Sequence, residues 1–162
     1  MSADNPIMVL DTNVWLDSYL DHREGTADAR ALITFAIEND ITLAYAATST
    51  KDVFYIVASE MKHRARKDTG ALSEEQARAC TALAWGCIEN MASVAVAAPV
   101  GEPQVWLARH YRSLHNDYED DLILAAVETS KADYLVTNDQ RLMGKSSAPA
   151  FTSADMLAYL QL

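Results

Sequence analysis

Short apolar runs alternate with longer helical segments along the chain, and this alternation constrains the fold more than any other feature. Strand-like runs are predicted at Ile7–Leu10, Ile41–Tyr45, Ala92–Ala97 and Tyr134–Thr137. Because strands that are joined through helices pair in parallel by right-handed crossovers, the order of elements restricts the topology. The sequence therefore predicts an α/β fold, a three-layer α/β/α sandwich with a central parallel sheet of four to five strands.

Apolar spacing and capping residues predict the helices that lie between these runs. The predicted helices are Val14–Leu20, Ala27–Asn39, Thr48 to about Arg66, Ser73 to about Asn90, Val105–Leu114, Asp120–Ser130 and Ser153–Leu160. Ser73-Glu74-Glu75-Gln76 is a capping box, and Gly70 is expected to end the helix before it. The remaining segments are predicted turns and loops, at Pro99–Pro103, His115–Glu119 and Gly144–Pro149.

Length and composition indicate one globular domain, residues 1–162. Half of the 162 residues are hydrophobic and 22% are charged, which is ordinary for a folded domain. No run approaches the roughly 18 apolar residues of a membrane span. Met1–Pro6 has no positive charge, so no signal peptide is expected. Cys80 and Cys87 would lie roughly 10.5 Å apart along a helix, too far for a disulfide, and reduced thiols in the cytoplasm are expected.

The net charge of −10 argues against a typical nucleic-acid-binding surface. However, a cluster of acids that binds divalent cations makes a formal charge count misleading. Basic residues are also concentrated in one segment next to His63: Lys62, Arg64, Arg66 and Lys67. Two interpretations of this segment stay open, a surface that binds a nucleic-acid strand and a solvated helix end.

Four aspartates follow or adjoin predicted strands in a way that suggests a metal site. Asp11 and Asp139 follow the first and last predicted strands, Asp52 lies in a helix after the second, and Asp120 opens the helix before the last. Ligands of parallel sheets bind beyond the carboxyl ends of the strands. Carboxylates that meet there can hold Mg²⁺ or Mn²⁺, which activates water for phosphodiester hydrolysis. Each aspartate alone could equally be a helix cap or a turn residue, so the prediction depends on their combination.

In three of its motifs the chain resembles the PIN-domain family. Asp11-Thr12-Asn13 is similar to the motif that opens these domains, Asp117 to Ala126 is similar to their central acidic helix, and Leu135 to Asp139 is similar to their final strand and turn. The resemblance covers nearly the whole chain. It implies a Mg²⁺- or Mn²⁺-dependent nuclease that commonly acts on RNA, and many bacterial members resemble the toxin of a VapBC-type toxin–antitoxin pair.

The resemblance also implies roles for particular residues. Asp11, Asp120 and Asp139 match metal-binding acids, and Asp52 occupies a position where the family usually has Glu. Supporting residues are Asn13, which would brace the first aspartate, Thr137, which would steady the site, and Asp117 as an auxiliary ligand. The third acid could be Asp120 or Asp121, and Asp120 is preferred because it keeps the apolar helix face in phase.

Other functions compete with this prediction. A phosphatase of the haloacid-dehalogenase kind needs a second Asp two residues after the first, and Asn13 occupies that position. The serious alternative is a catalytically inactive PIN-like module that binds nucleic acid or protein. The expected partners are RNA, possibly an antitoxin that plugs the acidic site, and a second copy of the chain in a homodimer, with no membrane association.

Overall fold

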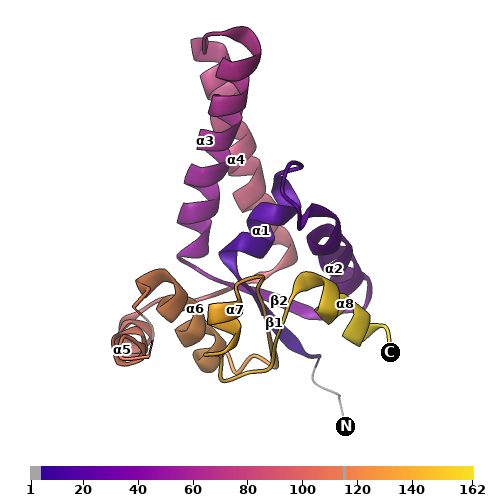
Figure 1. Ribbon diagram of the computed structural model, residues 1–162, viewed down its shortest axis with the longest axis vertical. Helices are drawn as coiled ribbons and strands as arrows, with labels where there is room; N and C mark the ends of the chain where they lie inside the picture. The colour runs from indigo at the N-terminus through magenta and orange to yellow at the C-terminus, as the bar shows by residue number, and fades with distance from the viewer. Residues whose placement is uncertain (1–4, 115) are drawn as a thin grey trace.

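Five parallel strands form the central sheet of the computed structural model, which describes residues 5–114 and 116–162 (Figure 1). The strands are β1 Ile7–Leu10, β2 Thr42–Ala46, β3 Val96–Ala98, β4 Tyr134–Val136 and β5 Ala150–Phe151. They lie in the order β3-β2-β1-β4-β5. His115, which begins the predicted loop His115–Glu119, and the first four residues of Met1–Pro6 lie outside the described residues. The predicted parallel α/β sandwich is confirmed.

Eight helices of the described residues cover the two faces of the sheet. They are α1 Thr12–Tyr19, α2 Thr26–Glu38, α3 Ser49–Thr69, α4 Glu74–Val94, α5 Glu102–Tyr111, α6 Tyr118–Thr129, α7 Gln140–Met143 and α8 Ser153–Leu160. None of the helices in the described part of the chain combines the length and the apolar character that crossing a membrane requires.

Side chains of β1 alternate between two apolar cores, as expected for a strand that is buried on both faces. Met8 and Leu10 pack with residues of α1, α2, α3, α4 and α8, among them the fully buried Trp15. Val9 points to the other face, where it packs against Ile123 of α6 and Leu142. The two cores account for the three layers.

Helices α3 and α4 form a long antiparallel hairpin that extends away from the sheet (Figure 1). Near its base Phe54 packs edge-on against Trp85, with ring centroids 5.0 Å apart. Gly70 ends α3 in the left-handed conformation (φ 77°), which glycine adopts without steric cost. Ser73 and Gln76 form the predicted capping box at the start of α4.

Some predicted boundaries were wrong. The strand predicted at Ala92–Ala97 begins too early, because α4 continues to Val94 around the fully buried Met91. The acidic helix begins at Tyr118 and not at Asp120, because the side chain of Asp117 caps it. The shortest helix, α7, and the shortest strand, β5, were not predicted.

The strand order reverses at β1, and this reversal indicates where a binding site is expected. From β1 the chain adds β2 and β3 on one side and later β4 and β5 on the other. Crevices at the carboxyl ends of strands flanking such a reversal are the usual binding sites of open parallel sheets. Here those ends lead into Asp11 after β1 and into residues 137–139 after β4.

Candidate functional site

Asp11 is a buried carboxylate at the start of α1, where β1 ends. Only 3% of the residue is exposed. Its backbone N–H donates to the carbonyl oxygen of Val136 (2.9 Å), and its Oδ2 accepts a hydrogen bond from Oγ1 of Thr137 (2.7 Å). Burial raises the pKa of Asp11 above its ordinary value of 3.8, although hydrogen bonds from Thr137 and from the backbone of Thr12 and Asn13 lower it. The hydrogen bonds therefore stabilise the ionised carboxylate, but by less than burial destabilises it.

Thr137 links this carboxylate to the backbone of the next acid along the sheet edge, Asp139. Its hydroxyl is fully buried, and besides donating to Asp11 it accepts the backbone N–H of Asp139 (3.0 Å). The carboxylate of Asp139 caps α7, where Oδ1 accepts from the backbone N–H groups of Arg141 (2.7 Å) and Leu142 (3.4 Å). The negative charge of Asp139 further raises the pKa of Asp11, so the two acids are close enough to repel each other.

The first turn of α6, in the connection from β3 to β4, brings further carboxylates to this region. Oδ1 of Asp117 accepts from the backbone N–H groups of Glu119 (3.1 Å) and Asp120 (3.4 Å), so Asp117 is a helix cap. The pKa of Glu119 is raised by burial and then by Asp52, Asp11, Asp117 and Asp120. Glu119 thus lies in the combined field of four other acids.

Glu119 was missed by the sequence reasoning, which assigned it to a polar loop. The signal that could have identified it is the cap: an Asp at position 117 places residues 118–120 in the first helical turn, where acids face the sheet edge.

Asp120 and Asp121 differ in their surroundings, as expected for residues about 100° apart around a helix. Asp120 is half-buried and contributes to the raised pKa of Glu119. Asp121 is 2% exposed and lines a cavity between α5 and α6 together with Arg109 and Arg112. Asp120 thus acts on Glu119, whereas Asp121 is buried between α5 and α6.

Asp52 reaches the same region from the first turn of α3. Its side chain is 19% exposed and pairs with Nζ of Lys51 (3.0 Å). A hydrogen bond from Oγ1 of Thr12 to Oγ of Ser49 (2.8 Å) ties the start of α1 to the start of α3. Among the neighbouring charges, that of Asp52 raises the pKa of Glu119 most, so Asp52 interacts electrostatically with the acids at the start of α6.

The structure thus brings together six carboxylates at the sheet edge, which we call the acidic cluster: Asp11, Asp52, Asp117, Glu119, Asp120 and Asp139. A set of carboxylates alone is the donor chemistry of hard divalent cations. Their mutual repulsion and the burial of Asp11 also fit a bound cation. In residues 5–114 and 116–162, however, no three acidic, histidine or cysteine side chains lie close enough to hold one metal ion. The residues fit such an ion in chemistry and charge, without a preformed ligand shell.

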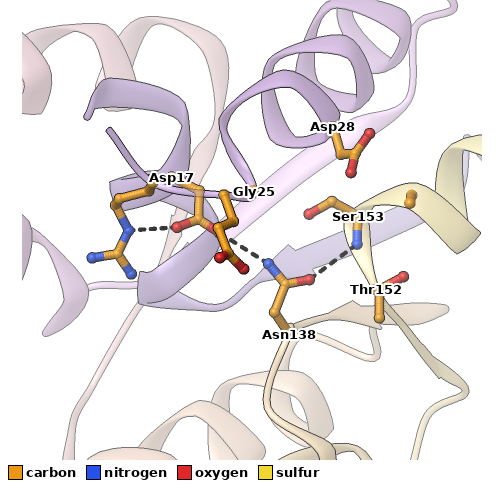
Figure 2. A pocket seen from close by; sticks show the side chains of 9 residues that line it. Asp17, Gly25, Asp28, Asn138, Thr152 and Ser153 are labelled. Atoms are coloured by element: carbon orange, nitrogen blue, oxygen red, sulfur yellow. Dashed lines mark hydrogen bonds and ion pairs between the residues drawn. The ribbon is translucent and has the colours of Figure 1, made fainter. Parts of the chain in front are cut away.

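Asn13 differs from its expected role as a brace of the first aspartate. Its backbone supports Asp11, while its side-chain Oδ1 accepts a long hydrogen bond from Nη2 of Arg23 (3.5 Å). Arg23 belongs to a separate polar cavity of about 560 Å³ between α1, α2 and α8, whose labelled residues Figure 2 shows. Asp17 and Asn138 also line this cavity, and none of the three was singled out from the sequence.

Comparisons with known proteins agree with the fold. Residues 8–141 match the family described as PIN domain. The fold is similar to that of VapBC2 from Rickettsia felis bound to a DNA fragment from their promoter (TM-score 0.63, 14% identity, 90% of this chain and 98% of that chain covered). It is also similar to FitAcB from Neisseria gonorrhoeae (TM-score 0.59, 18% identity, 90% and 97% covered) and to PAE2754 from Pyrobaculum aerophilum (TM-score 0.54, 14% identity, 99% and 98% covered). No curated protein matches the sequence.

Proposed function

Because the chain belongs to the PIN domain family, we propose that it is a single-domain, Mg²⁺- or Mn²⁺-dependent ribonuclease that hydrolyses phosphodiester bonds. The observation that carries this proposal is the buried carboxylate of Asp11, joined to Asp139 through one threonine hydroxyl. A carboxylate with 3% exposure and a second acid beside it needs a cation to offset the cost of burial. A helix cap or turn would not need either feature.

Asp11, Asp52, Asp120 and Asp139 would hold the cation, and Glu119 would add negative charge beside them. When bound, Mg²⁺ or Mn²⁺ supplies an activated water and offsets the charge that develops on the phosphate. The chain's own part is to position the acids: Thr137 orients Asp11, and the backbone N–H groups of α7 orient Asp139. The ammonium of Lys51 pairs with Asp52, which raises the pKa of Lys51 and makes it a poor general base.

The test is cleavage of single-stranded RNA by the purified protein with Mn²⁺, repeated after addition of EDTA. We expect cleavage with Mn²⁺, none with the chelator, and none for Asp11→Asn, which keeps the shape of the side chain and removes its charge. A surface control is Asp21→Asn, since Asp21 is exposed and pairs with Arg30 away from the acidic cluster. Equal cleavage with and without EDTA would refute the metal-dependent reaction.

A second function is favoured by one observation. Asp52 is paired with Lys51 and is one methylene shorter than the Glu that the family usually has at this position. That combination suits a PIN-like module that binds nucleic acid or protein without turnover. The same experiment decides between the two, because such a module would bind RNA equally with Mn²⁺ and with EDTA and would cleave it in neither.

The proposed partners are RNA, an antitoxin and a second copy of the chain. Two of the similar structures, VapBC2 and FitAcB, are toxin–antitoxin complexes, and this supports an antitoxin partner for the present chain. Exposed aromatic side chains on α4 and α5, Trp85 and Trp106, offer anchors for protein contacts. Light scattering at high protein concentration tests the homodimer, and a monomer there would refute it. Both cysteines are free thiols, which suits the cytoplasmic location that we propose.

A further inference from the structure

A set of hydrogen bonds lies beside the acidic cluster and ties α1 to the turn after β4 (Figure 2). Its centre is the carboxylate of Asp17, a residue that is only 6% exposed. Oδ1 accepts from Nε of Arg23 at 2.5 Å, and Oδ2 accepts from Nδ2 of Asn138 at 2.9 Å. Both carboxylate oxygens are therefore engaged, each by a different segment of the chain.

The backbone around Asp17 is shaped to admit this carboxylate. Gly25 lies against it, and a Cβ at this position would overlap Oδ2 of Asp17 and come within 3.3 Å of Nδ2 of Asn138. The φ angle of Gly25 is −78°, which any residue adopts, so glycine is needed for space and not for backbone conformation. The close approach of α2 to Asp17 thus depends on the absence of a side chain.

Both ends of this network reach the segments that carry the candidate ligands. On one side Arg23 also contacts the side chain of Asn13, two residues after Asp11 (3.5 Å). On the other side Asn138 lies between Thr137 and Asp139, and its Oδ1 accepts the backbone N–H of Ser153 at the start of α8 (3.4 Å). The network therefore spans from the end of β1 to the end of β4.

A buried aspartate paired with a partly exposed arginine gives little net stability, since desolvation offsets much of the attraction. Its more specific effect is geometric. The contact between Asp17 and Asn138 is a further tie between α1 and residues 137–139, in addition to the hydrogen bond from Thr137 to Asp11.

We propose that Asp17, Arg23 and Asn138 are positioning residues that set the distance between the Asp11 and Asp139 carboxylates. This inference rests on the proposed metal-dependent function. Partners that orient metal-binding side chains typically change metal affinity by about 10–100-fold when they are lost. Displacement of the turn after β4 would move Asp139 and Thr137 together, so both the second acid and the donor to Asp11 would be misplaced.

The test exchanges the two partners of the central contact. Asn138→Asp alone places two carboxylates against each other and should push the turn away from α1. The double variant Asp17→Asn with Asn138→Asp restores the contact with the same net charge as the natural chain. The new amide at position 17 donates to the new carboxylate at position 138 and still accepts from Arg23, while the new carboxylate still accepts from Ser153.

Two quantities are measured for each variant: Mn²⁺ affinity by calorimetry, and hydrogen exchange of the Asp139 amide in the metal-free protein. We expect Asn138→Asp to weaken Mn²⁺ binding by about tenfold or more and to speed exchange, and the double variant to recover both. An extra negative charge near a cation would by itself tighten binding, so electrostatics without positioning predicts the opposite sign. The control is Asp21→Asn, which breaks another Asp–Arg pair and should change neither quantity.

The proposal is overturned if Asn138→Asp changes neither quantity, or if the double variant stays as weak as the single one. If the natural chain binds no Mn²⁺, the proposed function fails, and hydrogen exchange alone then decides whether the contact holds the turn. If Asn138→Asp does not fold, Arg23→Gln replaces it, because its side chain is 30% exposed and its loss is milder. This variant also removes a positive charge, so weaker Mn²⁺ binding again supports positioning and tighter or unchanged binding overturns it.

Discussion

Replacement of Thr137 by Val tests whether one hydroxyl supports the candidate site. Valine keeps the shape of the side chain but removes the donor to Asp11 (2.7 Å) and the acceptor of the Asp139 N–H (3.0 Å). A hydrogen bond to a charged group contributes about 1.5–3 kcal/mol, and a buried amide without a partner costs about 1–3 kcal/mol. Because the contributions overlap, we expect the free energy of unfolding to fall by about 2–4 kcal/mol. For a domain of this size that lowers Tm by about 4–15 °C.

The matched control is Thr137→Ser, which keeps the hydroxyl and loses one buried methyl group, at a cost of about 1 kcal/mol. Both variants are compared with the natural chain by urea denaturation of the metal-free protein. Equal free energies of unfolding for the two variants would refute the argument, because loss of the hydroxyl would then cost no more than loss of one buried methyl group.

The pH dependence of the same variants separates the carboxylate contact from the amide contact. Burial already raises the pKa of Asp11, and loss of the Thr137 hydrogen bond raises it further. An acid with a raised pKa in the folded state costs stability once it ionises, and that cost is absent below its unfolded value of 3.8. The deficit of Thr137→Val should therefore be smaller near pH 3.5 and grow as the pH rises through the folded pKa of Asp11. A deficit that does not vary with pH would mean that Asp11 gains nothing from the hydroxyl.

Three further predictions concern the acidic cluster and the basic segment of α3. Asp120→Asn should raise the Tm of the metal-free protein, shrink the Tm shift caused by Mn²⁺ and abolish RNA cleavage. The control Asp28→Asn, at an exposed position in the first turn of α2, should leave the Mn²⁺ shift unchanged. A lower Tm of the metal-free Asp120→Asn protein with an intact Mn²⁺ shift would mean that Asp120 has a structural role. Glu119→Gln should stabilise the metal-free protein at pH 7 but not below about pH 4, because the raised pKa of Glu119 makes its ionisation unfavourable in the folded state. Urea denaturation at both pH values measures this, and an equal gain in stability at the two pH values would contradict it. Arg64→Glu with Arg66→Glu should weaken RNA binding and flatten its salt dependence, and an unchanged salt slope would mean that this exposed segment is a solvated helix end.

The arrangement of the sheet could be predicted because its signals are local. Ile7–Leu10 and Tyr134–Val136 are apolar runs that end in polar residues, and the helices between strands indicate a parallel sheet, although not which strands are neighbours. The short strand Ala150–Phe151 could not be predicted, since two residues show no periodicity. Ala92–Ala97 looked like a strand because Val94 and Val96 alternate with alanines, but Ala is also the best helix former and burial of Met91 prolongs the helix to Val94.

The candidate site was partly predictable for the same reason. Asp11 and Asp139 are marked by their strands, whereas Glu119 depends on where α6 begins, which the Asp117 cap decides. Asp17 had no signal at all: its partner Asn138 is 121 residues away, and a mid-helix aspartate usually faces solvent.

Pairing of the first strand with the fourth also has a consequence for biosynthesis. The hydrogen bond between Thr137 and Asp11 closes a loop of 126 residues, and β4 cannot add to β1 until the ribosome has released that whole length. A nascent chain that stops between residues 99 and 133 has β1, β2 and β3 but lacks both the donor to Asp11, which is Thr137, and the second acid, which is Asp139. The acidic cluster is therefore among the last parts of the molecule to assemble, and truncated translation products cannot carry it.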